Sequence, residues 1–279
     1  MGGEEHSQAF KEFEAAGWSA NAAAYDRLTG AITARVADAL LDAAGVAAGA
    51  RVLDVGCGTG ALCAAAAGRG ARPAGVDLAD GMLTAARRAR PELEFDRGDA
   101  EALPYAGASF DAVLAAFVVN HVPHPERAAA ELRRVLRPGG RAALAMWGPP
   151  AEVPFLGLFD EAMRAAGVRD RAARAVPPGP DAFRFADEDA LCGLLEAAGF
   201  ERVDVRRLVV SHPVASADEL WDGVHGGSVR TAAQLRALDD GDRARVRDAL
   251  EALLDERRAG GGPELEAAVL IAAGVSPAA

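Results

Sequence analysis

The sequence predicts an α/β fold in which a doubly wound, mainly parallel sheet carries helices on both faces. Three observations lead to this fold class: an apolar strand that runs into a glycine loop at residues 51–60, a second apolar strand that ends in Asp77, and an alternation of strand and helix patterns that continues to residue 147. Parallel strands need crossover connections, and the intervening helices supply them. We therefore expect one sheet whose strand ends form a ligand site.

The first strand and its loop read Arg-Val-Leu-Asp-Val-Gly-Cys-Gly-Thr-Gly over residues 51–60. The aliphatic residues suit a buried strand, and the alternate glycines allow a sharp turn and a close approach of the backbone to a ligand. A helix is expected at 61–67 and a strand at 74–78, which contains Asp77. In such a sheet this carboxylate reaches ribose hydroxyls lying over the loop. These features predict a nucleoside-binding half-site.

The pattern continues over the next seventy residues. Strands are expected near 93–96, from 109 to 115 and at 141–147, with a helix at 125–136. That helix runs into Leu-Arg-Pro-Gly-Gly, a stop signal made of proline and glycine. The third strand is followed by Gly-Asp-Ala-Glu-Ala-Leu-Pro, which begins at Gly98.

Taken in this order, the motifs of residues 50–147 resemble those of the class I S-adenosylmethionine-dependent methyltransferases, particularly the branch that contains quinone-biosynthesis and small-molecule enzymes. The resemblance implies a Rossmann-like sheet of seven strands, in which the last, at 266–274, runs antiparallel, with a helical cap. It also implies S-adenosyl-L-methionine as the cofactor and S-adenosyl-L-homocysteine as the product.

The same resemblance implies which residues hold the cofactor. Gly56, Gly58 and Gly60 would surround its methionine portion, Asp77 would bind the ribose hydroxyls, and Asp99 with the amide of Ala100 would recognise the adenine. An aromatic residue of the N-terminal segment would lie near the methionine carboxylate. The further residues expected at the cofactor are Tyr25, Asp54, Cys57, Leu78, Glu101, Leu103 and Phe117.

One residue departs from the family pattern. The family usually has Asp where this chain has His124, directly before a proline that starts a helix. Because that Asp would act as a helix N-cap, we expect a weaker cap and no change in cofactor binding.

The rest of the chain is expected to surround the core at 47–147. The predicted divisions are an N-terminal helical segment over the cofactor (1–46), a cap insertion (148–186), a return to the sheet (187–212), a second helical insertion (213–262), and the last strand with the C-terminus (263–279). The first insertion is rich in proline and aromatic residues, which suits either a cap over the acceptor or a small hydrophobic core. Ser216 with Glu219 and Thr231 with Gln234 predict capping boxes in the second.

Methyl transfer from a sulfonium is an in-line displacement, and a hydroxyl acceptor additionally needs a base for its proton. His121 follows the fourth strand, and His225 is flanked by glycines in an expected loop; each is a candidate base, and each has a plain structural role as its alternative. Candidate acceptor contacts are Asn120, Trp147, Phe155, Trp221 and Arg230.

Composition narrows the functional class. The net charge of −11 disfavours nucleic acid as a partner. No run of apolar residues is long enough to predict a membrane span, and the polar N-terminus does not resemble a signal peptide. Three unevenly spaced cysteines fit no metal pattern and favour a reducing, cytoplasmic setting in a bacterium. Whether the chain is a monomer or a homodimer stays open.

Three functions remain compatible with these patterns. The first is a methyltransferase for a small hydroxylated, amino or enolic metabolite, in specialised natural-product biosynthesis. The second keeps the fold and cofactor pocket for another reaction, such as a cyclisation. The third is a nicotinamide-dependent oxidoreductase, which the Leu-Arg-Pro-Gly-Gly motif at 136–140 and the missing second half of a dinucleotide domain disfavour.

Overall fold

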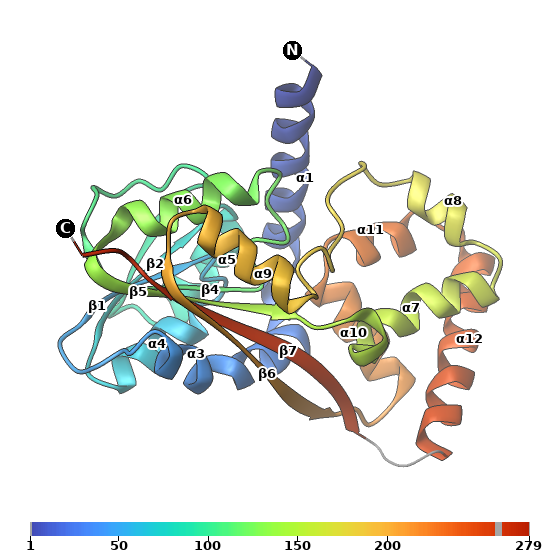
Figure 1. The fold of residues 1–279 in the computed structure, drawn as a ribbon. Helices are drawn as coiled ribbons and strands as arrows, with labels where there is room; N and C mark the ends of the chain where they lie inside the picture. The colour runs from blue at the N-terminus through green and yellow to red at the C-terminus, as the bar shows by residue number, and fades with distance from the viewer. Residues whose placement is uncertain (1, 260–263, 279) are drawn as a thin grey trace.

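A seven-stranded sheet in the order β3-β2-β1-β4-β5-β7-β6 forms the centre of the computed structural model, which describes residues 2–259 and 264–278 (Figure 1). Strands β1 to β5 pair in parallel, whereas β7 lies antiparallel between β5 and β6. This confirms the predicted sheet and its antiparallel last strand. The strands are β1 (Arg51–Val55), β2 (Arg72–Asp77), β3 (Glu94–Arg97), β4 (Phe110–Ala116), β5 (Leu136–Trp147), β6 (Glu201–Pro213) and β7 (Glu264–Val275).

Helices cover both faces of this sheet because neighbouring strand residues point to opposite sides. Val52 and Leu114 belong to one hydrophobic cluster with α3 and α4, whereas Leu53 and Val113 belong to another with α6 and α9. The core helices are α3 (Ala37–Ala43), α4 (Ala61–Gly68), α5 (Asp80–Ala89), α6 (Pro125–Val135) and α9 (Glu188–Ala197), and the short elements α2 (Thr29–Thr33) and η1 (Ala34–Val36) precede them.

The start of β5 differs from the sequence prediction. Helix α6 ends at Val135, one residue before its predicted end, but the strand begins at Leu136 rather than at residue 141. Leu136 pairs with Phe110, and the register then shifts before Ala112 pairs with Arg141. The proline and glycines at 138–140 therefore do not form a separate turn after the helix. They belong to the irregular start of β5.

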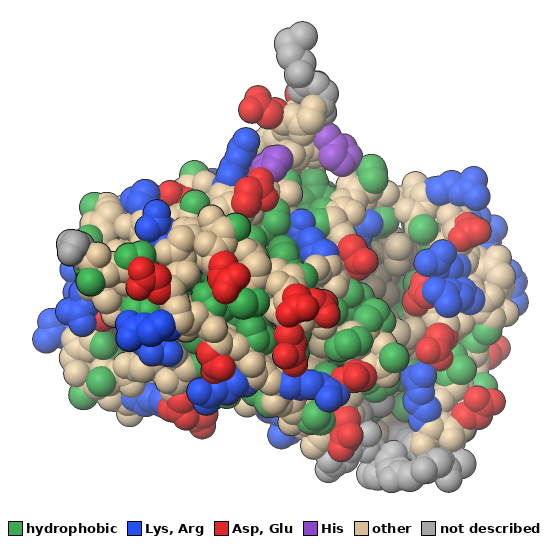
Figure 2. All heavy atoms as spheres, in the orientation of Figure 1, with side chains coloured by type: hydrophobic (Ala, Val, Ile, Leu, Met, Phe, Trp, Pro, Cys, Tyr) green, Lys and Arg blue, Asp and Glu red, His purple; other side chains and the backbone are tan. Residues whose placement is uncertain are grey.

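A cap of helices lies beside the carboxyl ends of β4 and β5, on the right of Figure 1. It contains η2 (Pro150–Glu152), α7 (Pro154–Ala165), α8 (Arg169–Arg174), α10 (Ala217–Gly227), α11 (Arg230–Arg236) and α12 (Asp240–Ala259). The boundary expected at residue 262 lies outside the described residues. Helix α1 (Gly2–Tyr25) runs between cap and core and packs against α10 and α5. Its N-terminal end projects from the body of the protein (Figure 2).

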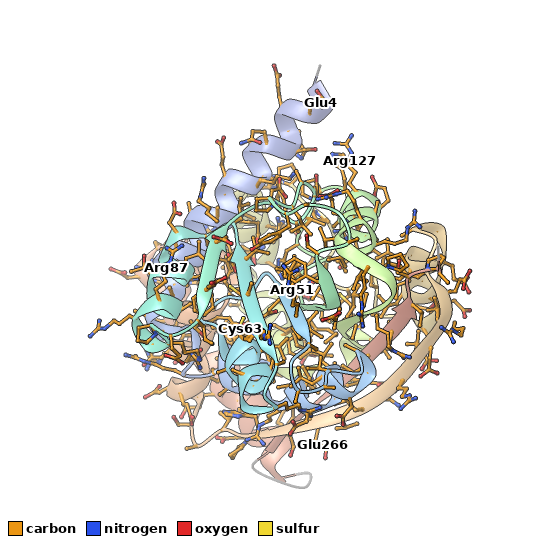
Figure 3. All side chains as sticks on the ribbon, turned by 90° about the vertical axis from the view of Figure 1, so that its left-hand side faces the viewer. Glu4, Arg51, Cys63, Arg87, Arg127 and Glu266 are labelled. Atoms are coloured by element: carbon orange, nitrogen blue, oxygen red, sulfur yellow. The ribbon has the colours of Figure 1, made fainter. Side chains whose placement is uncertain are left out.

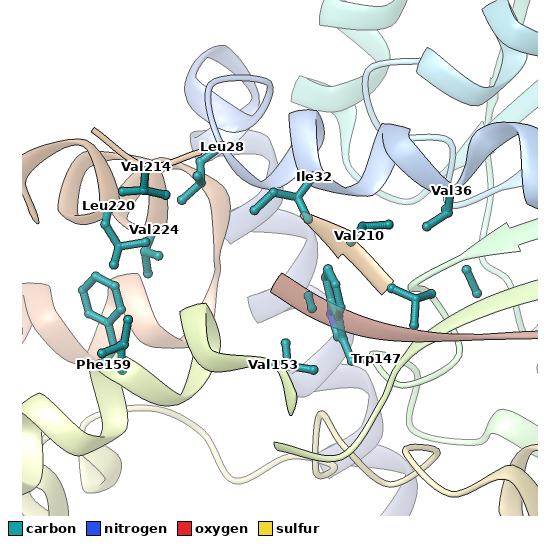
Figure 4. Close-up of a cluster of buried hydrophobic side chains, with 14 of the residues drawn as sticks. Leu28, Ile32, Val36, Trp147, Val153, Phe159, Val210, Val214, Leu220 and Val224 are labelled. Atoms are coloured by element: carbon teal, nitrogen blue, oxygen red, sulfur yellow. The ribbon is translucent and has the colours of Figure 1, made fainter. Parts of the chain in front are cut away.

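One continuous apolar cluster joins the cap to the core (Figure 4). Trp147 at the end of β5 and Ile32 of α2 contribute from the core, and Phe159, Leu220 and Val224 contribute from the cap. Because apolar burial stabilises by about 25 cal/mol per Å², this shared cluster fixes the cap on the sheet and gives the space between them a defined shape.

The two predicted capping boxes have different outcomes. Ser216 Oγ accepts a hydrogen bond from the Glu219 N–H (3.0 Å), which confirms the predicted cap. The Glu219 carboxylate accepts its return bond from the Ala215 N–H (2.7 Å), one residue before the N-cap. The Thr231 box is wrong, because α11 already begins at Arg230 and its N-cap position has no side-chain hydrogen bond. A capping residue must precede the helix, and Thr231 lies inside it.

Within residues 2–259 and 264–278, the structure contains no helix with the length and apolar character that crossing a membrane requires.

Candidate active site

A cavity of about 240 Å³ lies between the glycine loop, helix α1 and the cap. It brings together residues that are far apart in the sequence and that come from the predicted cofactor and acceptor sets. The predicted residues that line it are Tyr25, Gly56, Gly58, Asp77, Leu78, Asp99, Ala100, Phe117, Asn120, His121, Trp147 and Arg230.

The glycine loop follows β1 and forms one wall of this cavity. Gly56 and Gly58 have φ angles of +67° and +53°, which side-chain-bearing residues rarely adopt. A Cβ on Gly58 would lie 3.9 Å from the Tyr25 ring in otherwise open space, so a side chain there would occupy the cavity. The backbone of the loop at Gly58 is thus open to the cavity.

Asp77 is held at the edge of the loop by two backbone groups. Its carboxylate accepts hydrogen bonds from the Gly58 N–H (2.9 Å) and the Ala79 N–H (2.8 Å). Burial raises the pKa of Asp77, and the backbone hydrogen bonds act in the opposite direction by favouring the charged form. The side chain therefore keeps a defined position beside the loop, where the ribose was expected.

Asp54 and Cys57 line a smaller cavity, which shares Gly56 and Gly58 with the first. Burial raises the pKa of Asp54 to about 7, and the Cys63 thiol donates to its carboxylate (3.4 Å) from inside α4 (Figure 3). Burial also raises the pKa of the Cys57 and Cys63 thiols. A cysteine acts as a nucleophile only as the thiolate, which a raised pKa disfavours. Cys57 therefore has a packing role in the loop, which suits its small side chain.

Three residues of the predicted cofactor set line neither cavity. Gly60 has a φ of +82° at the start of α4, and a Cβ there would lie 2.7 Å from the Phe95 ring, so its role is in packing. Leu103 is buried in the hydrophobic cluster that the sheet forms with α6 and α9. The Glu101 carboxylate accepts hydrogen bonds from Lys11 and from the backbone of His124, both at 2.7 Å.

The weaker helix cap expected at His124 is confirmed. His124 occupies the N-cap position of α6 without any side-chain capping hydrogen bond. Its Nε2 lies instead 3.1 Å from Ser7 Oγ of α1.

Lys11 was not predicted from the sequence, yet it lines the cavity beside Asp99. Its ammonium donates to Asp99 and to Glu101, each at 2.7 Å. Burial lowers the pKa of Lys11, but the two carboxylates outweigh it and the net effect raises the pKa. Asp99 therefore has a cationic neighbour from α1 at the place where adenine recognition was expected.

His121 lines the cavity as predicted and contacts two further residues of α1. Its Nδ1 lies 3.2 Å from Oε2 of Glu14, which is 4 % exposed. The indole of Trp18 donates to the same oxygen (3.0 Å) and packs edge-on against the imidazole, with ring centroids 5.5 Å apart. Glu14 was also missed by the sequence analysis. The spacing of residues 11, 14 and 18 places them on one helical stripe, but it does not indicate which loop that stripe faces.

The loop after β4 is held by groups from the first insertion. Asn120 is 3 % exposed and donates to the Ala182 carbonyl (3.3 Å). Arg184, which the sequence analysis did not select, donates to the Val119 carbonyl (2.5 Å) and to that of Val122. These contacts fix the backbone on both sides of His121.

Aromatic and cationic side chains line the cap side. Phe117, with a φ of +56°, stacks on Trp147 with centroids 4.0 Å apart. Arg230 donates to the Pro177 carbonyl (3.0 Å) and also faces the cavity. The side chain of Phe155 lies outside the described part of the structure.

Trp221 and His225 do not line the cavity, contrary to the sequence prediction. Both belong to α10, so His225 lies in a helix and not in a loop. Trp221 is 8 % exposed, and its ring centroid lies 6.0 Å from that of Phe159 and 5.1 Å from that of His225. Burial lowers the pKa of His225. Trp221 belongs, with Leu220 and Val224 of the same helix, to the apolar cluster that joins cap and core, which accounts for this placement.

Replacing Trp221 with alanine is expected to destabilise the protein by about 3–5 kcal/mol, because it would leave a cavity in the cluster that joins cap and core. Thermal melting measures this loss, and Trp221→Phe, which keeps most of the volume, should lose much less. A Trp221→Ala protein with the parent melting temperature and a raised acceptor KM would place the indole in the acceptor site after all.

Comparison with known proteins agrees with this geometry. The profile of a family described as a methyltransferase domain matches residues 53–144. A demethylmenaquinone methyltransferase of Beutenbergia cavernae is 35 % identical over 178 residues, which cover 61 % of this chain and 73 % of that protein. The matched profile spans the glycine loop, Asp77, Asp99 and His121, but ends before the cap.

Solved structures share the fold. A putative methyltransferase from an antibiotic biosynthesis pathway of Anabaena variabilis superposes with a TM-score of 0.61 at 18 % identity, covering 85 % of this chain and 96 % of that one. The [4+2]-cyclase SpnF gives 0.54 at 22 % identity, with 88 % and 82 % covered.

The residues present fit S-adenosylmethionine. At Gly58 the loop leaves open space where a side chain would project, and Asp77 is held beside it, at the place expected for a ribose. The antiparallel β7 also departs from the all-parallel dinucleotide fold, which argues against the nicotinamide alternative. From the sheet, the loop and the similarity to its relatives, the chain belongs to the class I S-adenosylmethionine-dependent methyltransferases.

Proposed function

We propose that this small-molecule methyltransferase acts on a hydroxyl or enol group of a mainly apolar, specialised metabolite, and that His121 is the base. The observation that carries this proposal is the position of His121 in the cavity, on a loop that Arg184 and Asn120 hold in place. A proton acceptor is needed when the acceptor atom must lose a proton as the new bond forms. An imidazole that faces the cavity can take that proton.

The shape and polarity of the cap side suit such an acceptor. Phe117, Trp147 and Leu156 offer apolar surface, while Arg230 offers a cation at the α11 side. An aromatic or polyketide-like ring carrying an acidic hydroxyl would match apolar walls with a few polar groups.

The chemistry divides between cofactor and protein. When bound, S-adenosylmethionine supplies an electrophilic methyl group on a sulfonium and leaves as S-adenosylhomocysteine. The glycine loop and Asp77 hold it, and the aromatic wall excludes water and orients the acceptor for an in-line approach. His121 removes the hydroxyl proton at Nε2.

The cap supports an acceptor different from that of the relatives. Those proteins are demethylmenaquinone methyltransferases, and the match to the Beutenbergia protein covers 61 % of this chain. The cap walls contributed by Leu156, Val229 and Arg230 lie outside the methyltransferase domain matched at 53–144. Since acceptor specificity depends on the walls of the site more than on the shared fold, we infer that this chain has its own acceptor.

A panel of acceptors tests this function. The enzyme is incubated with S-adenosylmethionine and one acceptor at a time: a phenol, an enol, a primary amine or reduced demethylmenaquinone. The mass of each product is measured by mass spectrometry. We expect the phenol or the enol to gain one methyl group. Methylation of the amine alone would contradict the proposed reaction, and a marked preference for demethylmenaquinone would contradict a specialised acceptor. A product with the mass of its substrate would favour the cyclisation alternative.

A further inference from the structure

We propose that Glu14 of α1 is a positioning residue for His121, so that the N-terminal helix forms part of the catalytic machinery. This inference rests on the proposed function, in which His121 acts as the base. It adds a carboxylate that orients the imidazole and selects which nitrogen carries the proton.

The contact itself defines the tautomer. Glu14 Oε2 lies 3.2 Å from His121 Nδ1, and a carboxylate can only accept a hydrogen bond. The proton of a neutral imidazole must then be on Nδ1, which leaves the lone pair on Nε2. A base of this kind needs its second nitrogen held by a third group, as in the carboxylate–histidine pairs of hydrolases.

The surroundings of Glu14 make this arrangement rigid. Trp18 lies one helical turn further along α1 and donates to the same Oε2 at 3.0 Å. The helix is tied to the core by Lys11, which bridges Asp99 and Glu101, and by Ser19, whose hydroxyl accepts a hydrogen bond from the Gly81 N–H (3.1 Å). With both sides anchored, the carboxylate has little freedom to leave the imidazole.

The second carboxylate oxygen points to a role beyond packing. Glu14 Oε1 is buried and has no hydrogen-bond partner among the described residues, and Glu14 lines the same cavity as His121. Burying an acidic side chain with one unpaired oxygen is unfavourable. A residue that served only to dock α1 would gain nothing from this charge, whereas a carboxylate beside the base stabilises the imidazolium that forms when the proton arrives.

The state of the imidazole can be measured without any acceptor. Nitrogen-15 NMR of histidine-labelled protein distinguishes the two tautomers, and the signal that disappears in His121→Gln belongs to this residue. We expect the parent to show the Nδ1-protonated form and Glu14→Gln to shift toward the Nε2-protonated form. Glu14→Asp should restore part of the parent signal. Glu12→Gln, which changes an exposed carboxylate on the same helix, is the matched control and should leave it unchanged.

Kinetics with the phenol or enol of the acceptor panel complete the test. In Glu14→Gln, we expect kcat to fall at least about tenfold with little change in KM. This loss should stay below the roughly 10⁴-fold loss of a fully buried carboxylate–histidine pair, because His121 is 30 % exposed. An unchanged tautomer, or an unchanged kcat beside an impaired His121→Ala enzyme, overturns the positioning role. A His121→Ala enzyme with full activity instead overturns the proposed function, whatever the tautomer shows.

Discussion

Replacing His121 by alanine should lower kcat for a hydroxyl acceptor by roughly 10²–10⁴-fold, the range that a positioned proton acceptor supplies. The reason is that the acceptor proton then has no base within the cavity wall formed by the loop after β4, where His121 lies. Steady-state kinetics with saturating S-adenosylmethionine measure the loss. The change should fall mainly on kcat, because the base acts on the transition state more than on the bound substrate.

The acidity of the acceptor provides the control for this experiment. A phenol that is already ionised in the assay buffer needs no base, so parent and His121→Ala enzymes should methylate it at similar rates. A weakly acidic phenol of similar size should show the full loss. Equal impairment with both phenols would contradict a base and would indicate that His121 shapes the site.

Asp77→Ala is expected to weaken S-adenosylhomocysteine binding by about 1.5–3 kcal/mol, the range for a lost hydrogen bond to a charged group. This corresponds to a dissociation constant roughly 10- to 150-fold larger. The carboxylate would no longer be available to the ribose, and the Gly58 and Ala79 N–H groups would lose their acceptor. Isothermal calorimetry with the folded variant measures the affinity directly.

Asp77→Asn separates the two parts of that effect. The amide oxygen can still accept from one of the backbone groups, so the loop should keep more of its shape while the charge is lost. We expect Asp77→Asn to bind S-adenosylhomocysteine more weakly than the parent and more tightly than Asp77→Ala. If Asp77→Ala binds S-adenosylhomocysteine as tightly as the parent does, the ribose assignment is wrong.

The elements that the sequence predicted well are those whose signals are local. The glycine loop directly follows an apolar strand, and Asp77 lies within the next one, so their spacing along the chain already encodes their position in the sheet. The Ser216 and Glu219 capping box is local in the same sense. Thr231 shows the limit, because the same pattern occurs inside a helix when the preceding residue is already helical.

Tertiary packing decided the remaining parts of the site. Glu14 and His121 are 107 residues apart, as Lys11 and Asp99 are 88 apart, and no pattern within either segment specifies that α1 crosses the loop after β4. Trp221 is an aromatic residue of the kind that contacts an acceptor, yet it is buried beside Phe159 in the apolar cluster that joins cap and core. The sequence by itself determined the sheet and the position of the glycine loop, and it favoured methyl transfer. Only the tertiary structure decided which side chains line the cavity, because that depends on the sum of many weak apolar contacts between distant segments.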